Sequence, residues 1–126
     1  MKITVNTAIV AKLFSRVEQY SWNEDEFIFK NLHDDKDFAD FFDCWIAPEI
    51  ITFNIEEQIV LKDSLKYVIN FLSDLEIKHI TTDRNINIPF GGKARQFYIR
   101  IWSKLYNDEY ALNRRKRKLY RINPND

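Results

Sequence analysis

Few residues of this sequence combine the type and the spacing that chemistry requires. His33 precedes Asp34 and Asp35, but no second histidine stands at helical spacing and no cysteine cluster accompanies it, so a metal site is not expected. Nothing in the sequence places a nucleophile or an oxyanion donor near His79. The single cysteine, Cys44, lies in the apolar run FFDCWI and is predicted to be a buried, inert thiol.

Both glycines lie in the stretch FGGKARQ, residues 90–96. A nucleotide-binding Walker loop is not expected, because the stretch lacks the required glycine spacing and Gly92-Lys93 is followed by alanine where that loop needs serine or threonine. Lys93 and Arg95 nevertheless fall in the first turn of a predicted helix, where positive charge is unfavourable. A single phosphate bound to the helix N-terminus would relieve that cost. A simple turn from Pro89 to Gly92 is favoured over this phosphate contact.

Carboxylates are plentiful, and Mg²⁺ needs only one or two of them together with substrate phosphates. A metal-dependent nuclease built from Glu24, Asp34, Asp37 or Asp40 is therefore an alternative. Aromatic residues rather than a catalytic lysine follow these acids. We expect a protein that is not an enzyme and carries no cofactor.

Charge is strongly segregated along the chain, although 19 basic and 19 acidic residues give a net charge of zero. Residues 1–83 hold 8 basic and 16 acidic residues, whereas residues 84–126 hold 11 and 3. Between residues 24 and 57, 11 acids face only Lys30 and Lys36. Either the two halves neutralise each other across the folded surface, or the acidic half meets a basic partner.

The acidic half is predicted to form one face of a helix. In the run DDKDFADFFDCWIAPE, four aromatic residues fall in one sector about 100° wide, and Asp37, Asp40 and Asp43 fall opposite. Such a row can imitate spaced phosphates and block a basic toxin or nucleic-acid enzyme, which predicts an inhibitor or immunity type of protein-binding module. Its partner-binding residues would be Glu24, Asp25, Glu26, Asp34, Asp35, Asp37, Asp40 and Asp43.

The basic half predicts an alternative function, nucleic-acid binding by an accessory or regulatory protein. Lys93, Arg100 and Lys104 lie within about 40° of one another around a helix. Five consecutive cations at residues 114–118 cover a whole helical circumference, so they must be solvated or bound to an anion. The nucleic-acid or anion-binding residues would be Lys93, Arg95, Arg100, Lys104, Arg114, Arg115, Lys116, Arg117 and Lys118.

Helical periodicity predicts an all-α, single-domain bundle of about five helices in residues 1–112, followed by a basic C-terminal extension, residues 113–126. The first helix starts at Asn6 or Thr7 and the second after Asn23. The third starts at Asp34 or Asp35 and ends before Pro48. The fourth, residues 55–76, follows an Asn54 cap and buries Leu61, Leu65, Val68, Leu72 and Leu75. The fifth, residues 93–106, carries an apolar stripe from Ala94 to Leu105.

Two segments leave an α+β alternative open. Residues 77–90 lack helical periodicity and are expected to be a loop or short strands. The C-terminus is either a last helix or a hairpin that pairs YAL, residues 110–112, with LYRI, residues 119–122. No signal peptide or membrane span is apparent, and the single cysteine fits a reducing compartment, so a soluble cytoplasmic protein is expected.

Overall fold

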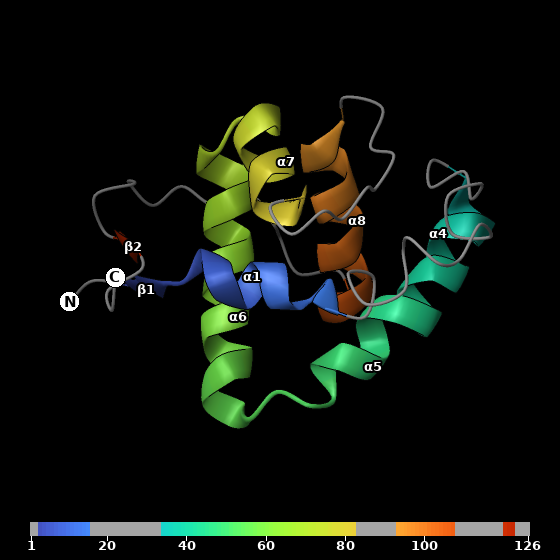
Figure 1. Cartoon of the computed structure of the whole chain (residues 1–126), viewed down its shortest axis with the longest axis horizontal. Coiled ribbons are helices and arrows are strands. Elements are labelled where there is room, and N and C mark those ends of the chain that lie inside the picture. Colours follow the sequence, from blue (N-terminus) through green and yellow to red (C-terminus); the bar gives the residue numbers. More distant parts are fainter. Residues whose placement is uncertain (1–2, 16–33, 83–92, 108–119, 123–126) are drawn as a thin grey trace.

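The computed structural model describes residues 3–15, 34–82, 93–107 and 120–122. Within these ranges the chain is an all-α bundle of about five helices with almost no strand, as predicted. The long helix α6 (Ile55–Phe71) runs through the molecule, α1 (Thr7–Lys12) crosses it, and α7 (Asp74–Thr82) and α8 (Ala94–Tyr106) lie beside it (Figure 1). The predicted second helix, near residues 24–32, lies outside the described residues.

The chain enters the bundle through β1 (Ile3–Val5) and α1. The Asn6 side chain accepts a hydrogen bond from the backbone of Ala8, which confirms the predicted helix start. The Asn6 backbone N–H donates at 2.9 Å to Oγ of Ser64, which is fully buried on α6. This long-range hydrogen bond fixes the start of α1 against the middle of α6.

Residues 120–122 form β2 (Tyr120–Ile122), which pairs in parallel with β1 and places Ile3 opposite Tyr120. The pairing joins the two ends of the chain in a two-stranded sheet beside α6 (Figure 1). The sequence offered a local choice between a helix and a hairpin for this segment. The observed partner of the strand is instead more than 110 residues away, which no local pattern can indicate. Residues 110–112 lie outside the described residues.

A continuous helix follows in three parts, α4 (Asp35–Phe41), the π-helical turn η1 (Phe42–Ile46) and α5 (Ala47–Ile50). The predicted start is confirmed, since Asp34 caps α4 and accepts hydrogen bonds from the backbone N–H groups of Lys36 and Asp37. The predicted end before Pro48 is wrong. A proline inside an α-helix clashes with the carbonyl four residues earlier. Here the wider π turn precedes it, and Pro48 occupies the first turn of α5, where its missing N–H is tolerated.

The fourth predicted helix is in fact two helices. α6 ends at Phe71, and Leu72 has an extended backbone with φ −98° and ψ 149°. Ser73 then caps α7: its Oγ accepts from the N–H of Glu76, and the Glu76 carboxylate accepts from the N–H of Ser73. This reciprocal capping box is visible in the sequence as Ser-x-x-Glu, but the regular leucine spacing obscured it. As a result Leu75 is 65% exposed.

The loop or strands predicted from residue 77 onward are also wrong for residues 77–82, which are helical in α7. Ile77 and Thr81 are buried there, and Thr81 Oγ1 lies 2.5 Å from the hydroxyl of Tyr98 on α8. Burial of the Tyr98 phenol raises its pKa, so the hydroxyl stays neutral. Residues 83–90 lie outside the described residues.

An aromatic cluster forms the centre of the core. Phe97 of α8 contacts Phe38 and Phe41 of the third helix, with ring centroids 5.5 Å and 5.8 Å away, and Phe14 at 6.3 Å. Phe38, Phe41 and Phe97 lie on the two helices whose apolar sides the sequence predicted, and Phe14 lies in the turn after α1. Cys44, by contrast, is exposed, so the prediction of a buried thiol is wrong. The helical angle of Cys44 lies between those of Asp40 and Asp37, on the outward side. Its predicted burial rested on its residue type and on the apolar run around it.

Glu57 gives the fold a predicted dependence on pH. Its pKa is lowered, first by the hydrogen bond from the Asn54 backbone N–H and second by that from the Lys12 ammonium, 2.9 Å away. A lowered folded-state pKa contributes stability above the ordinary value of 4.5, and that contribution disappears as pH falls through the lowered value. Urea unfolding between pH 7 and pH 3 should therefore show a smaller acid-induced loss for Glu57→Gln than for the wild type.

The neighbouring variant Glu56→Gln is the control, since Glu56 is exposed on the same helical turn, and it should retain the pH dependence of the wild type. Parallel pH profiles for the wild type and Glu57→Gln would contradict this role of Glu57.

Candidate functional site

The outward side of the third helix carries the predicted row of carboxylates. Asp40 and Asp43 are exposed and Asp37 is half-buried. On the opposite side Phe38 and Phe41 are each only 2% exposed. Because its aromatic side is packed into the core, the helix cannot turn about its axis, and the carboxylates keep a fixed spacing toward solvent.

The other predicted acidic residues are distributed around the start of this helix. Asp34 is exposed and its side chain serves as the cap of α4. Asp35 is also exposed, and its Oδ1 accepts a hydrogen bond from Nη2 of Arg100 at 2.8 Å. Glu24, Asp25 and Glu26 lie outside the described residues.

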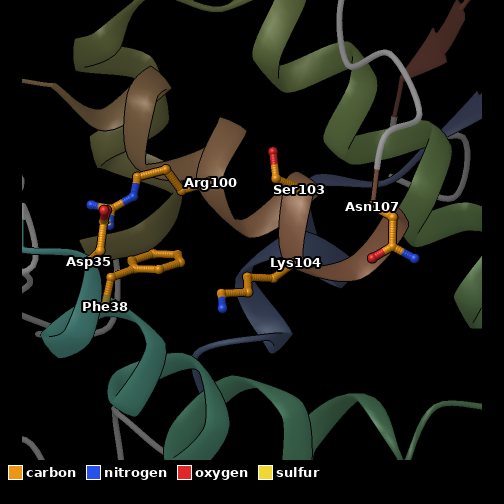
Figure 2. Close-up of a pocket in the computed structure, with 6 residues that line it drawn as sticks. All are labelled: Asp35, Phe38, Arg100, Ser103, Lys104 and Asn107. Atoms are coloured by element: carbon orange, nitrogen blue, oxygen red, sulfur yellow. Dashed lines mark hydrogen bonds and ion pairs between the residues drawn. The ribbon is translucent and has the colours of Figure 1, made fainter.

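Arg100 connects the acidic and basic halves of the chain. Its guanidinium lies 4.3 Å from the ring centroid of Phe38 and pairs with Asp35 (Figure 2). The Asp35 side chain is fully exposed, so solvent screens the ion pair and it contributes little to stability. The interpretation that the two halves neutralise each other thus holds for this pair, whereas Asp40 and Asp43 remain exposed on the same helix.

A shallow groove of about 440 Å³ lies between α4 and α8. Its lining comprises Asp35, Phe38, Arg100, Ser103, Lys104 and Asn107 (Figure 2). The lining has one carboxylate, two cations and two uncharged polar groups, but neither histidine nor cysteine. These groups offer hydrogen-bonding and charged contacts to a ligand.

The structure places the described basic residues of the predicted site in different surroundings. Lys93 and Lys104 are exposed at the two ends of α8. Arg95 turns inward, and its guanidinium donates to the carbonyls of Ile69 and Leu72 at the end of α6. The run 114–118 lies outside the described residues.

The N-terminus of α8, where the sequence indicated a phosphate contact, already has an anionic partner. The backbone N–H of Arg95 donates at 2.8 Å to Oδ1 of Asp74, in the first turn of α7. A carboxylate at this position satisfies one of the N–H groups left unpaired at a helix start. The carboxylate of Asp74 thus takes the place of the predicted phosphate at the N-terminus of α8.

Metal-binding and acid-base groups are sparse in the described part of the chain. Across residues 3–15, 34–82, 93–107 and 120–122, no three His, Cys, Asp or Glu side chains group as a metal would require. His79 is exposed on α7 and borders an apolar hollow with Leu72, Leu75, Glu76 and Ile80. His33 and Glu24 lie outside the described residues.

Comparison with protein families, with characterised proteins and with solved structures finds no significant match to this chain. Among the helices that the structure describes, none has both the length and the apolar character needed to cross a membrane.

Three exposed isoleucines, one after α5 and two on α6, were not predicted from the sequence. Ile51, at the end of α5, is 83% exposed, and Ile55 and Ile59 on α6 are 76% and 59% exposed. A helical projection of α6 would have shown the last two, because they lie about 130° from the stripe that contains Leu61 and Leu65. The prediction for this helix considered only its buried side.

Proposed function

We propose that this chain is a non-catalytic protein-binding module of the inhibitor or immunity type, which acts in the cytoplasm. It covers a basic protein, such as a toxin or a nucleic-acid enzyme, with the acidic face of its third helix. The observation that carries the proposal is the row Asp37, Asp40 and Asp43 on a helix whose other side is packed into the aromatic core. Carboxylates held on a packed helix fix the register of a basic partner and accelerate its encounter.

The test starts from basic proteins that the immobilised chain retains from the native host at low salt. After mass spectrometry, each candidate is purified and its binding is measured by calorimetry and by stopped-flow kinetics. We expect the triple variant Asp37→Lys, Asp40→Lys, Asp43→Lys to weaken binding by about 100-fold or more, chiefly through slower association. Raising the salt concentration should weaken wild-type binding and have little effect on the variant.

Lys36 provides a control of opposite sign on the same face. It is exposed on α4, at an angle between those of Asp40 and Asp43. Lys36→Glu should therefore tighten binding and accelerate association. Normal binding by the triple variant, with its helical circular dichroism unchanged, would refute the proposed function.

Nucleic acid is the other outcome that this test must recognise. Arg95 and Arg100 already bind other groups of the protein. The candidate contacts for nucleic acid are therefore Lys93, Lys104 and the run 114–118. Removal of residues 113–126 would also delete β2, so the informative variant replaces only the five cations by glutamine. Binding of labelled RNA or DNA that this variant loses, together with an unaffected triple aspartate variant, would favour nucleic-acid binding instead.

A further inference from the structure

We infer that Ile51, Ile55 and Ile59 form an apolar ridge that packs against a basic amphipathic helix of the partner. The inference rests on the proposed function and names the part of the interface that holds the complex together. All three side chains are more than half exposed, at 83%, 76% and 59%. Large exposed aliphatic side chains grouped along one line are a typical feature of interaction surfaces.

The geometry of the ridge fits a helix as its occupant. Ile55 and Ile59 are four residues apart on α6, so they lie about 40° from each other around the helix and form one row. Rows of this kind pack into the groove between the corresponding rows of another helix. Ile51, the residue after α5, precedes them in the chain by four residues and is exposed as well.

The charges around the ridge give the occupant its sign and its direction. Glu56 is exposed beside Ile55 and Ile59, and Asp63 lies one helical turn beyond Ile59 on the same side of α6. Lys62 and Lys66 hold their ammonium groups 5.0 Å and 5.6 Å from the rings of Tyr106 and Trp102 on α8. Basic side chains of the partner are therefore favoured beside Glu56, at the start of α6.

The two parts of the surface have different roles. Exposed carboxylates steer association and select a basic partner, but salt screens them and each contributes little affinity. Affinity at protein interfaces comes mainly from a few apolar or aromatic contacts that exclude water. Loss of the ridge should therefore accelerate dissociation, whereas loss of the aspartate row should slow association.

The test uses two synthetic 18-residue peptides of equal charge, an amphipathic one of leucine and lysine and a control with serine in place of leucine. Fluorescence anisotropy with the full-length protein should give the leucine peptide about tenfold higher affinity than the serine peptide. The double variant Ile55→Ser, Ile59→Ser should lose this advantage and still bind the serine peptide normally. Leu75→Ser is the matched control, because Leu75 is 65% exposed on α7, and it should keep the advantage.

The outcomes separate the ridge from the aspartate row. Equal affinities of the wild type for the two peptides would refute the ridge. So would a double variant that still prefers the leucine peptide, or a Leu75→Ser variant that loses this preference as completely as the double variant does. The triple aspartate variant serves as the complementary measurement, since it should lose most of its affinity for the serine peptide and keep the leucine advantage. An unchanged affinity there would count against the aspartate row and leave the ridge standing.

Discussion

Replacing Phe97 by alanine is expected to lower the free energy of unfolding by about 3–5 kcal/mol. The ring is 5% exposed and lies within 6.3 Å, centroid to centroid, of Phe14, Phe38 and Phe41. Truncation removes its transfer free energy and leaves a cavity bounded by α1, α4 and α8, which cannot all move inward together. A loss of this size is a large part of the stability of an ordinary domain, about 5–15 kcal/mol.

The measurement is urea unfolding followed by circular dichroism and tryptophan fluorescence, with m-values compared between variants. Phe97→Leu retains most of the volume and should lose clearly less stability. Ile59→Ala is the control for a large apolar side chain outside the core, and it should change the free energy of unfolding by no more than about 0.5 kcal/mol. A loss below about 1 kcal/mol for Phe97→Ala would show that these rings do not pack as observed.

Replacing Arg95 by methionine is expected to lower the free energy of unfolding by about 2–3 kcal/mol. The Arg95 side chain donates to the carbonyl of Ile69 at 2.9 Å and to that of Leu72, where α6 ends, while its backbone N–H donates to Asp74 of α7. One residue of α8 therefore joins three helix termini. Methionine retains the apolar stem and removes only the donors, so the carbonyls lose charge-assisted hydrogen bonds.

Thermal and urea unfolding measure this effect, and Lys93→Met is its matched control. Lys93 precedes Arg95 by two residues, is exposed and caps nothing through its side chain, so its replacement should be nearly neutral. Arg95→Lys should recover only part of the loss, because a single ammonium lacks the fork that reaches both carbonyls. Equal stabilities of the methionine variants at residues 93 and 95 would contradict this role of Arg95.

The main errors of the sequence analysis share one physical cause. Leucines at spacings of three and four continue across Leu72 to Leu75, so periodicity alone predicts one helix through a position where the chain is extended. Likewise Pro48 disfavours a straight α-helix, but a π turn just before it allows the chain to continue. In the first case the Ser73 capping box ended the helix that the leucine spacing predicted. In the second case the π turn continued the helix that Pro48 was expected to end.

The sequence predicted the acidic part of the candidate site better than its basic part. The outward position of Asp40 and Asp43 follows from helical angle, which the sequence contains. The inward turn of Arg95 depends on carbonyls 23 and 26 residues away, and the ion pair of Arg100 at the surface depends on Asp35, 65 residues away. Sequence spacing on α8 grouped these cations with Lys93 and Lys104, but it contains no information on those partners.

The sequence by itself determined where the described helices begin and which sides they bury, because caps such as Asn6, Asp34 and Asn54 act within three residues and burial repeats with the helical period. The tertiary structure alone decided how segments far apart in the chain pair with one another. It joined β1 to β2 and turned Arg95 toward the end of α6. These outcomes depend on contacts between distant segments, whose positions are set by packing of the whole core.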